Sequence, residues 1–193
     1  MELYEVVRRR RMVRNFEEEE VAPAALRRIL DAGRRAPSAG FTQAQDFVVL
    51  DSPGPRSRFW QAAAPGGGYT GVRRAPVLIL VVTSEQDYLS RYAEPDKGGD
   101  SHAPRFGAPY WWVDAGMAAM MLLLAAVEEG LGALFFGVPP ERLKRVKEAF
   151  GIPMEREIAG VVALGRPRHP LPRGSAARRA RRPYDDVVHR DRW

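Results

Sequence analysis

The sequence predicts an α+β fold: one domain over residues 1–193, with a mixed β-sheet flanked by helices and built around a buried central helix. Segments with the apolar spacing of amphipathic helices alternate with apolar runs of strand length. Residues 75–83 are apolar on both faces, which is typical of an interior strand. Residues 115–127 carry no polar side chain, so a helix there should be buried all round.

The expected helices other than the central one are short and mostly amphipathic. They lie at residues 2–11, at 22–36, around Phe59 and Trp60, and at 140–150. The residues expected to face inward are Leu3, Val6 and Val7 in the first helix, and Leu26, Ile29, Leu30 and Gly33 in the second.

The expected strands are residues 46–51, 75–83, 133–138 and 157–165, and residues 184–188 are compatible with a short last strand. The polar stretch 85–109 is long for a connection in a compact domain. Such a length is typical of a lid or binding loop, or of a partly disordered segment.

The apolar helix at 115–127 is too short to span a bilayer, which needs about 20 apolar residues. Glu128 and Glu129 return the chain to water, and Gly130 ends the helix. Two interpretations remain open: the core helix of a monomer, or a core helix that also packs against a second copy of the chain.

The composition excludes several kinds of chemistry. The chain has no cysteine, which excludes disulfides, thiolate nucleophiles and zinc–thiolate sites. The three histidines, His102, His169 and His189, have no metal-ligand spacing. No apolar signal segment follows the charged N-terminus, so we expect a cytoplasmic protein.

The net charge is +6, and almost all of the positive charge is arginine. The arginines are concentrated at residues 8–14 and at 166–192. Alternate residues of an extended chain point the same way, so Arg10 and Arg14 can converge, as can Arg179 and Arg181. Converging arginines are the usual means of holding a phosphate. The alternative is two solvated basic surfaces.

Six motifs occur in a family's order along nearly the whole chain: RRMVRNF, APSAG, EEGLGALFFG, FGIP, VVALGRP and RARRPYDDVVH. In this set the chain resembles the FMN-dependent nitroreductase family. The resemblance implies an α+β homodimer with two FMN molecules at the subunit interface. A second subunit would also cover a helix that is apolar on every side.

The resemblance carries the family's cofactor-binding residues onto this chain in four groups. The N-terminal segment is Arg10, Arg11, Met12 and Arg14, where Met12 replaces the family's serine. The turn expected from the other subunit is Pro37, Ser38, Ala39 and Gly40, followed by Phe41 at the family's asparagine place and by a shifted Gln43. The segment whose backbone faces flavin N5, through Phe136 and Gly137, is Leu134, Phe135, Phe136 and Gly137. The phosphate pair is Arg179 and Arg181, in a C-terminal tail, 166–193, that completes the site.

The resemblance implies an FMN-dependent NAD(P)H oxidoreductase that works by ping-pong hydride transfer. Its acceptors would be nitroaromatics, quinones or similar small electrophiles, with NADH or NADPH as donor and no catalytic side chain. The aromatics Phe106, Tyr110, Trp111 and Trp112 could wall the open face of the flavin or belong to the core. One alternative is a flavin oxidase or reductase specialised for one biosynthetic metabolite. The alternative of another class is a basic nucleic-acid-binding module. No nucleic-acid-binding motif is present, and we expect no nucleic-acid or membrane partner.

Overall fold

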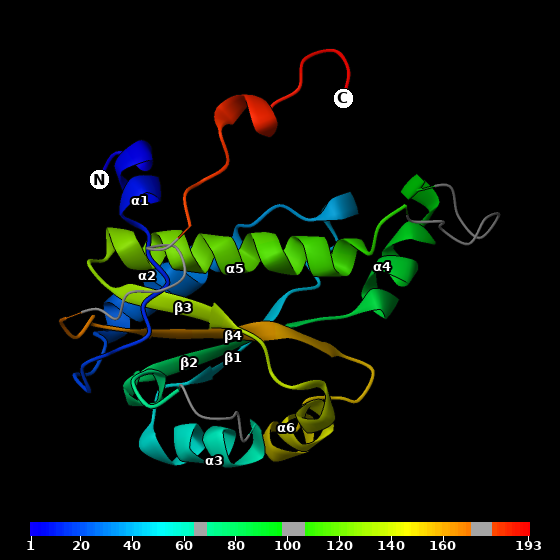
Figure 1. The fold of residues 1–193 in the computed structure, drawn as a ribbon. Coiled ribbons are helices and arrows are strands. Elements are labelled where there is room, and N and C mark those ends of the chain that lie inside the picture. The colour runs from blue at the N-terminus through cyan, green and yellow to red at the C-terminus, as the bar shows by residue number, and fades with distance from the viewer. Residues whose placement is uncertain (64–68, 98–106, 171–178) are drawn as a thin grey trace.

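The computed structural model describes residues 1–63, 69–97, 107–170 and 179–193, which form six α-helices and one four-stranded sheet (Figure 1). The helices are α1 (Leu3–Arg9), α2 (Pro23–Arg34), α3 (Pro53–Ala63), α4 (Glu85–Tyr92), α5 (Tyr110–Glu128) and α6 (Leu143–Phe150). The strands are β1 (Asp46–Leu50), β2 (Val77–Thr83), β3 (Gly132–Phe136) and β4 (Glu157–Gly165).

The sheet has the order β1-β2-β4-β3, and each neighbouring pair is antiparallel. The α+β class is therefore confirmed, but the expectation of a mixed sheet is wrong. Apolar periodicity shows which residues are buried and carries no information on the direction of the neighbouring strand. Among the described residues, the one parallel pairing is an isolated bridge between Met12 and Ala133.

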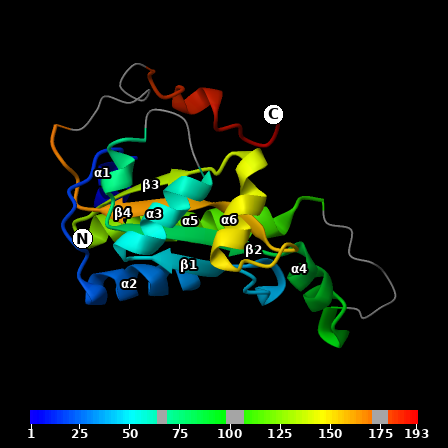
Figure 2. The same ribbon diagram turned by 90° about the horizontal axis from the view of Figure 1, so that it is seen from below.

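Strand β2 is the interior strand that the sequence predicts. All seven of its residues are buried. Alternation along the strand sends Val77, Ile79 and Val81 toward α2 and α5, whereas Leu78 and Leu80 face α3 and α6. The sheet therefore lies between two helical layers (Figures 1 and 2).

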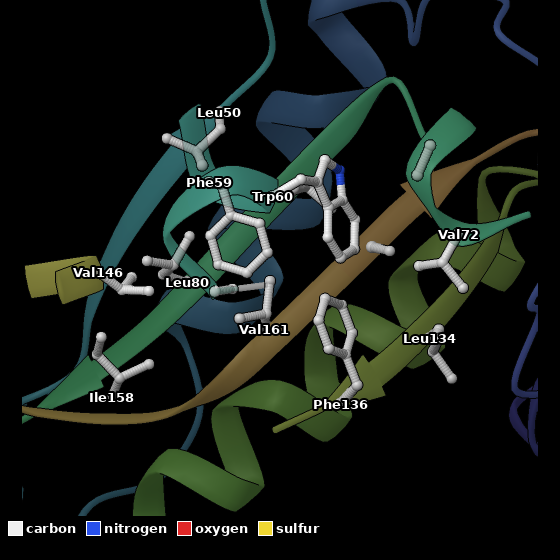
Figure 3. Packing of buried hydrophobic residues seen from close by; sticks show 14 of the residues in the cluster. Leu50, Phe59, Trp60, Val72, Leu80, Leu134, Phe136, Val146, Ile158 and Val161 are labelled. Atoms are coloured by element: carbon white, nitrogen blue, oxygen red, sulfur yellow. The ribbon is translucent and has the colours of Figure 1, made fainter. Parts of the chain in front are cut away.

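The layer beneath the sheet is built on aromatic rings. The indole of Trp60 on α3 stacks on Phe136 of β3, with ring centroids 5.7 Å apart and planes 7° apart. Phe59 meets the edge of Trp60 at 5.0 Å (Figure 3). Such ring pairs add about 0.5–1.5 kcal/mol to the effect of area burial, so they help to hold α3 against the last residue of β3.

Helix α5 covers the other face of the sheet beside α2, and its length exceeds the apolar run that marks it in the sequence. Among the described helices, α5 is the one that is long and apolar enough to cross a membrane. In the structure its residues Ala115, Ala119 and Leu122 pack against the sheet. Of the two interpretations of this helix, burial by one chain alone does not match the structure. Met117 and Met120 are 41% and 44% exposed, because no described residue of the chain covers that face.

Three further expectations need correction. Residues 85–109 are not one long loop, because α4 begins there and Ser84 Oγ accepts a hydrogen bond from the N–H of Asp87 at 3.3 Å. Residues 98–106 of this stretch lie outside the described residues. Instead of a strand at 184–188, the chain forms an exposed 3-10 turn, Tyr184–Asp186, and none of the described strands pairs with it. In α1, Leu3 and Val7 are exposed and Val6 alone is buried.

The N-terminal segment after α1 is bound to the rest of the fold by backbone hydrogen bonds. The N–H of Val13 donates to the carbonyl of Ala133 at 2.9 Å, and that of Phe16 donates to Gly71 at 3.3 Å. Gly71 lies so close that a Cβ there would meet the carbonyl oxygen of Arg14 at 2.4 Å. Residue 71 therefore has to be glycine for the segment to follow this path.

We expect Gly71→Ala to lower the free energy of unfolding by about 1–3 kcal/mol, the usual cost of overpacking. The overlap is with backbone, so a side-chain rotation cannot relieve it. Chemical denaturation measures the effect. The matched control is Gly54→Ala, where a Cβ meets nothing within 4 Å. Equal stability of the two variants would contradict the close approach.

Candidate functional site

The N-terminal arginine segment runs beside β3. The bridge between Met12 and Ala133 places the segment at the edge of the sheet next to the strand that holds Leu134 and Phe136. Two of the predicted groups of site residues therefore meet in the fold. Val13 is buried at 4% exposure, whereas Met12 and Arg14 are exposed, which is the alternation expected of an extended chain.

Arg10 is the residue of this segment that most needs a partner. Its Nη1 is buried and has no hydrogen-bond partner among the described residues. An uncompensated buried charge is costly unless it is paired or hydrogen-bonded. The chemistry of the site thus favours an anion beside Arg10, and a phosphate matches the geometry of a guanidinium.

The other two arginines of the segment have different surroundings. Arg14 is exposed, and its Nη1 donates to the carbonyl of Met12 at 3.2 Å. Arg11 lines a hollow of about 260 Å³ together with Arg9 and His169. The structure therefore separates Arg11 from Arg10, and a cofactor contact by Arg11 stays a prediction.

The C-terminal end of β3 contributes backbone. The side chains of Leu134 and Phe136 belong to the core beneath the sheet, and Phe135 packs on the opposite face. Gly137 follows the last paired residue of β3, and a Cβ there would meet nothing within 4 Å. Open space beside this backbone leaves room for a flat ring to approach.

The turn at 37–43 has an unusual backbone. Gly40 has a φ of 63°, and the two non-glycine residues Phe41 and Gln43 have φ values of 55° and 54°. Ser38 Oγ accepts a hydrogen bond from the N–H of Gln43 at 2.9 Å. The ring of Phe41 is 73% exposed. Left-handed backbone at a bulky residue is strained and persists where the surroundings enforce it.

The surroundings of the turn come from α4 and α5. Asp114, 2% exposed, accepts a hydrogen bond from the N–H of Ala39 at 2.7 Å and another from the Tyr88 hydroxyl at 2.6 Å. Nε of Arg91 donates to the carbonyl of Gly40 at 2.9 Å. Burial, and then the hydrogen bond to Asp114, raise the pKa of Tyr88 well above its usual range, so this phenol stays protonated.

Sequence reasoning assigned no role to Asp114, Tyr88 or Arg91. The available signal was a lone acid in an otherwise apolar helix, because an acid there is costly unless it is hydrogen-bonded. Among the aromatics expected to wall the site, Trp111 lies against Tyr88 with ring centroids 6.3 Å apart, and Phe106 lies outside the described residues.

The turn at 37–43 and the N-terminal arginine segment lie at opposite ends of α5 (Figure 1). Asp114 holds the turn near the start of the helix. Near its end, Glu128 accepts a hydrogen bond from the terminal amine of Met1 at 2.6 Å, beside α1. Glu128 lies fourteen positions after Asp114 in the sequence. That interval spans about 21 Å at 1.5 Å per residue. The turn and the arginine segment of one chain are therefore far apart.

The C-terminal arginines also lie away from the rest of the site. Arg179 and Arg181 are exposed, and no hydrogen bond or ion pair among the described residues joins them to Arg10. Figure 1 shows the tail standing clear of the helical layer that contains α5. The described residues contain no group of three His, Asp or Glu side chains that could hold a metal ion.

Comparison with known proteins gives a consistent result. Residues 7–166 match the model of the nitroreductase family. A candidate NADH dehydrogenase/NAD(P)H nitroreductase of Archaeoglobus fulgidus is 28% identical over 100% of this chain and 99% of its own. An NADH dehydrogenase of Thermus thermophilus is 29% identical over 82% of this chain and 83% of its own.

Among solved structures, a candidate nitroreductase of Desulfovibrio desulfuricans in complex with FMN superposes with a TM-score of 0.76. It is 25% identical in sequence over 100% of this chain and 98% of its own.

We expect Phe41→Asn to raise the free energy of unfolding by about 0.5–1 kcal/mol, because asparagine adopts left-handed backbone more readily than phenylalanine. Thermal and chemical unfolding of the apoprotein measure it. Phe41→Ala is the control, since it removes the ring and leaves the strain. If both variants have the same stability, the backbone of residue 41 is not strained.

Proposed function

This chain belongs to the nitroreductase family, and on that premise we propose that it is an FMN-dependent NAD(P)H oxidoreductase acting on nitroaromatics, quinones or similar small electrophiles. The observation that carries the proposal is the buried Nη1 of Arg10, which has no hydrogen-bond partner among the described residues. Its segment pairs with β3, and the open backbone of Gly137 follows that strand. The names of the relatives in Archaeoglobus and Thermus and the FMN of the Desulfovibrio structure support the same reading.

The residues fit FMN in charge and shape. Its phosphate is a dianion, and Arg10 offers a guanidinium whose buried Nη1 has no hydrogen-bond partner among the described residues. Bound FMN would supply the redox chemistry that this cysteine-free chain lacks, by taking up a hydride from NADH or NADPH and returning electrons to an acceptor. The chain itself would bind and orient the ring, and the backbone N–H of Phe136 or Gly137 would offer N5 a donor that does not titrate.

We further propose a homodimer, in which each flavin site takes residues from both chains. The exposed face of α5 carries Trp112, Val113, Met117 and Met120, a continuous apolar surface on a single chain. A two-fold axis across α5 would bring the start of one helix to the end of its copy. The turn of one subunit would thereby approach the arginine segment of the other, about 21 Å away within one chain.

The exposed C-terminal tail fits the same arrangement. Tyr184 and Val187 are 65% and 50% exposed, and Trp193 is 99% exposed. Apolar side chains in a tail that contacts little of its own chain are suited to a second copy. Contact of this tail with the partner would also give Arg179 and Arg181 a route to the phosphate. We propose that the dimer acts in the cytoplasm.

The described ion pairs weaken the case for a nucleic-acid-binding module. Arg28 pairs with Glu129 at 2.6 Å, and Arg166 pairs with Glu19 at 2.8 Å. Surface arginines that already face carboxylates do not form the unpaired basic stripe that follows a phosphate backbone. A flavin enzyme specialised for one metabolite remains the second candidate within the same family, since Phe41 replaces the family's asparagine.

The visible absorbance of the purified protein, reconstituted with FMN and desalted, tests the cofactor. Anaerobic addition of NADH or NADPH should bleach the bound flavin, and a quinone or nitroaromatic should restore its absorbance. A protein that retains no flavin after reconstitution would contradict the proposal. Bleaching without reoxidation by any of these acceptors would favour the specialised enzyme.

Arg10→Ala should weaken FMN binding by about 1.5–3 kcal/mol, the usual contribution of hydrogen bonds to charged groups. Riboflavin, which lacks the phosphate, should bind both proteins equally. Quenching of flavin fluorescence gives both dissociation constants. Arg8→Ala is the control, because this arginine lies on the exposed side of α1. An equal loss of riboflavin affinity would assign Arg10 to folding.

Met120→Arg should dissociate the dimer, because it buries a charge in an apolar interface. Unpaired burial of a charge costs several kcal/mol, enough to shift the dimer toward monomers at micromolar concentration. Light scattering measures the molar mass. Met154→Arg is the matched control, because Met154 is 50% exposed and lies outside α5. A wild-type monomer that holds FMN tightly would contradict the two-chain site.

A further inference from the structure

The carboxylate of Asp114 joins three separate elements. It lies on α5 at 2% exposure, in a helix whose neighbouring residues are apolar. One of its oxygens, Oδ2, accepts both the N–H of Ala39 and the hydroxyl of Tyr88 on α4. Burying a carboxylate is costly, so an acid at this position indicates a need for its hydrogen bonds.

The bond to Ala39 acts on the strained turn. The backbone at Phe41 and Gln43 lies in the left-handed region, which these residues adopt at a cost. The side of Gly40 is closed by Tyr92, since a Cβ there would meet the Tyr92 ring at 2.8 Å, and Arg91 holds the carbonyl of Gly40. The turn is thus held at Ala39 and Gly40 while Phe41 extends outward, 73% exposed.

We propose that Asp114 is a positioning residue of the flavin site: through Ala39 it fixes the turn at 37–43, so that the turn meets the isoalloxazine end of the flavin held by the partner chain. The inference rests on the proposed function. Asp114 itself lies too deep to touch a ligand, and the hydroxyl of Tyr88 fixes the orientation of its carboxylate.

Two substitutions distinguish the hydrogen-bond acceptor of Asp114 from its negative charge. Asp114→Asn keeps one oxygen, and that is sufficient because both donors share Oδ2. Asp114→Leu has nearly the same size and no acceptor. Thr83→Val is the control for damage to the same region. Thr83 is fully buried and its hydroxyl donates to the carbonyl of Trp111 on α5 at 3.1 Å, with no bond to the turn.

Two measurements are made on the full chain. Hydrogen exchange of the apoprotein follows the amide of Ala39, and fluorescence quenching gives the dissociation constant for riboflavin, which lacks the phosphate that Arg10 would hold. In Asp114→Leu the Ala39 amide should exchange at least about tenfold faster, and riboflavin should bind about tenfold more weakly, the effect of losing one charged hydrogen bond. Asp114→Asn and Thr83→Val should remain near wild type in both.

Several results would overturn the inference. Unchanged exchange at Ala39 in Asp114→Leu would mean that the carboxylate does not hold the turn. Equal loss of riboflavin binding in Thr83→Val would reduce Asp114 to a structural residue. If Asp114→Leu does not fold, exchange in the wild-type protein tests whether the carboxylate holds the turn. The amide of Ala39 should then exchange much more slowly than the amide of its neighbour Ser38, and equal exchange would overturn the inference. Wild-type protein that binds neither flavin overturns the proposed function, while the exchange at Ala39 still reports on the turn.

Discussion

Helix α5 carries apolar side chains on more sides than the described residues of one chain cover, and the rest of the structure is arranged around this constraint. The sheet and α2 take one side, through Ala115, Ala119 and Leu122. The opposite side keeps Met117 and Met120 in water when the chain is alone. Because apolar burial is the main favourable term in folding and association, that surface favours a second copy.

The same helix sets the separation of the functional groups. Its start holds the strained turn through Asp114, and its end lies beside α1 and the segment that carries Arg10. Within one chain the two groups lie far apart. In the dimer that we propose, the burial of α5 and the assembly of the site depend on one geometric arrangement, the pairing of α5 with its copy.

The unpaired groups agree with this arrangement. Among the described residues, Nη1 of Arg10 is buried without a hydrogen-bond partner, and the ring of Phe41 extends into solvent on left-handed backbone. Both features are costly for an isolated chain. With the exposed tail that carries Arg179 and Arg181, they support the proposed dimer.

The sequence by itself determined most of the helices and strands and the burial of the central strand β2. The apolar runs marked β2 and β4, Pro23 marked the start of α2, and Gly151 marked the end of α6, because these signals act over a few residues of chain. Motif order also predicted that Arg10 and the end of β3 bind the cofactor, and the structure brings the segment of Arg10 beside β3. Only the tertiary structure decided the antiparallel sheet, the helix at 85–92, the exposed tail and the hydrogen bonds of Asp114. These depend on which segments meet, and Ala39 lies 75 residues from the acid that holds it. Local periodicity carries no information about partners at that distance.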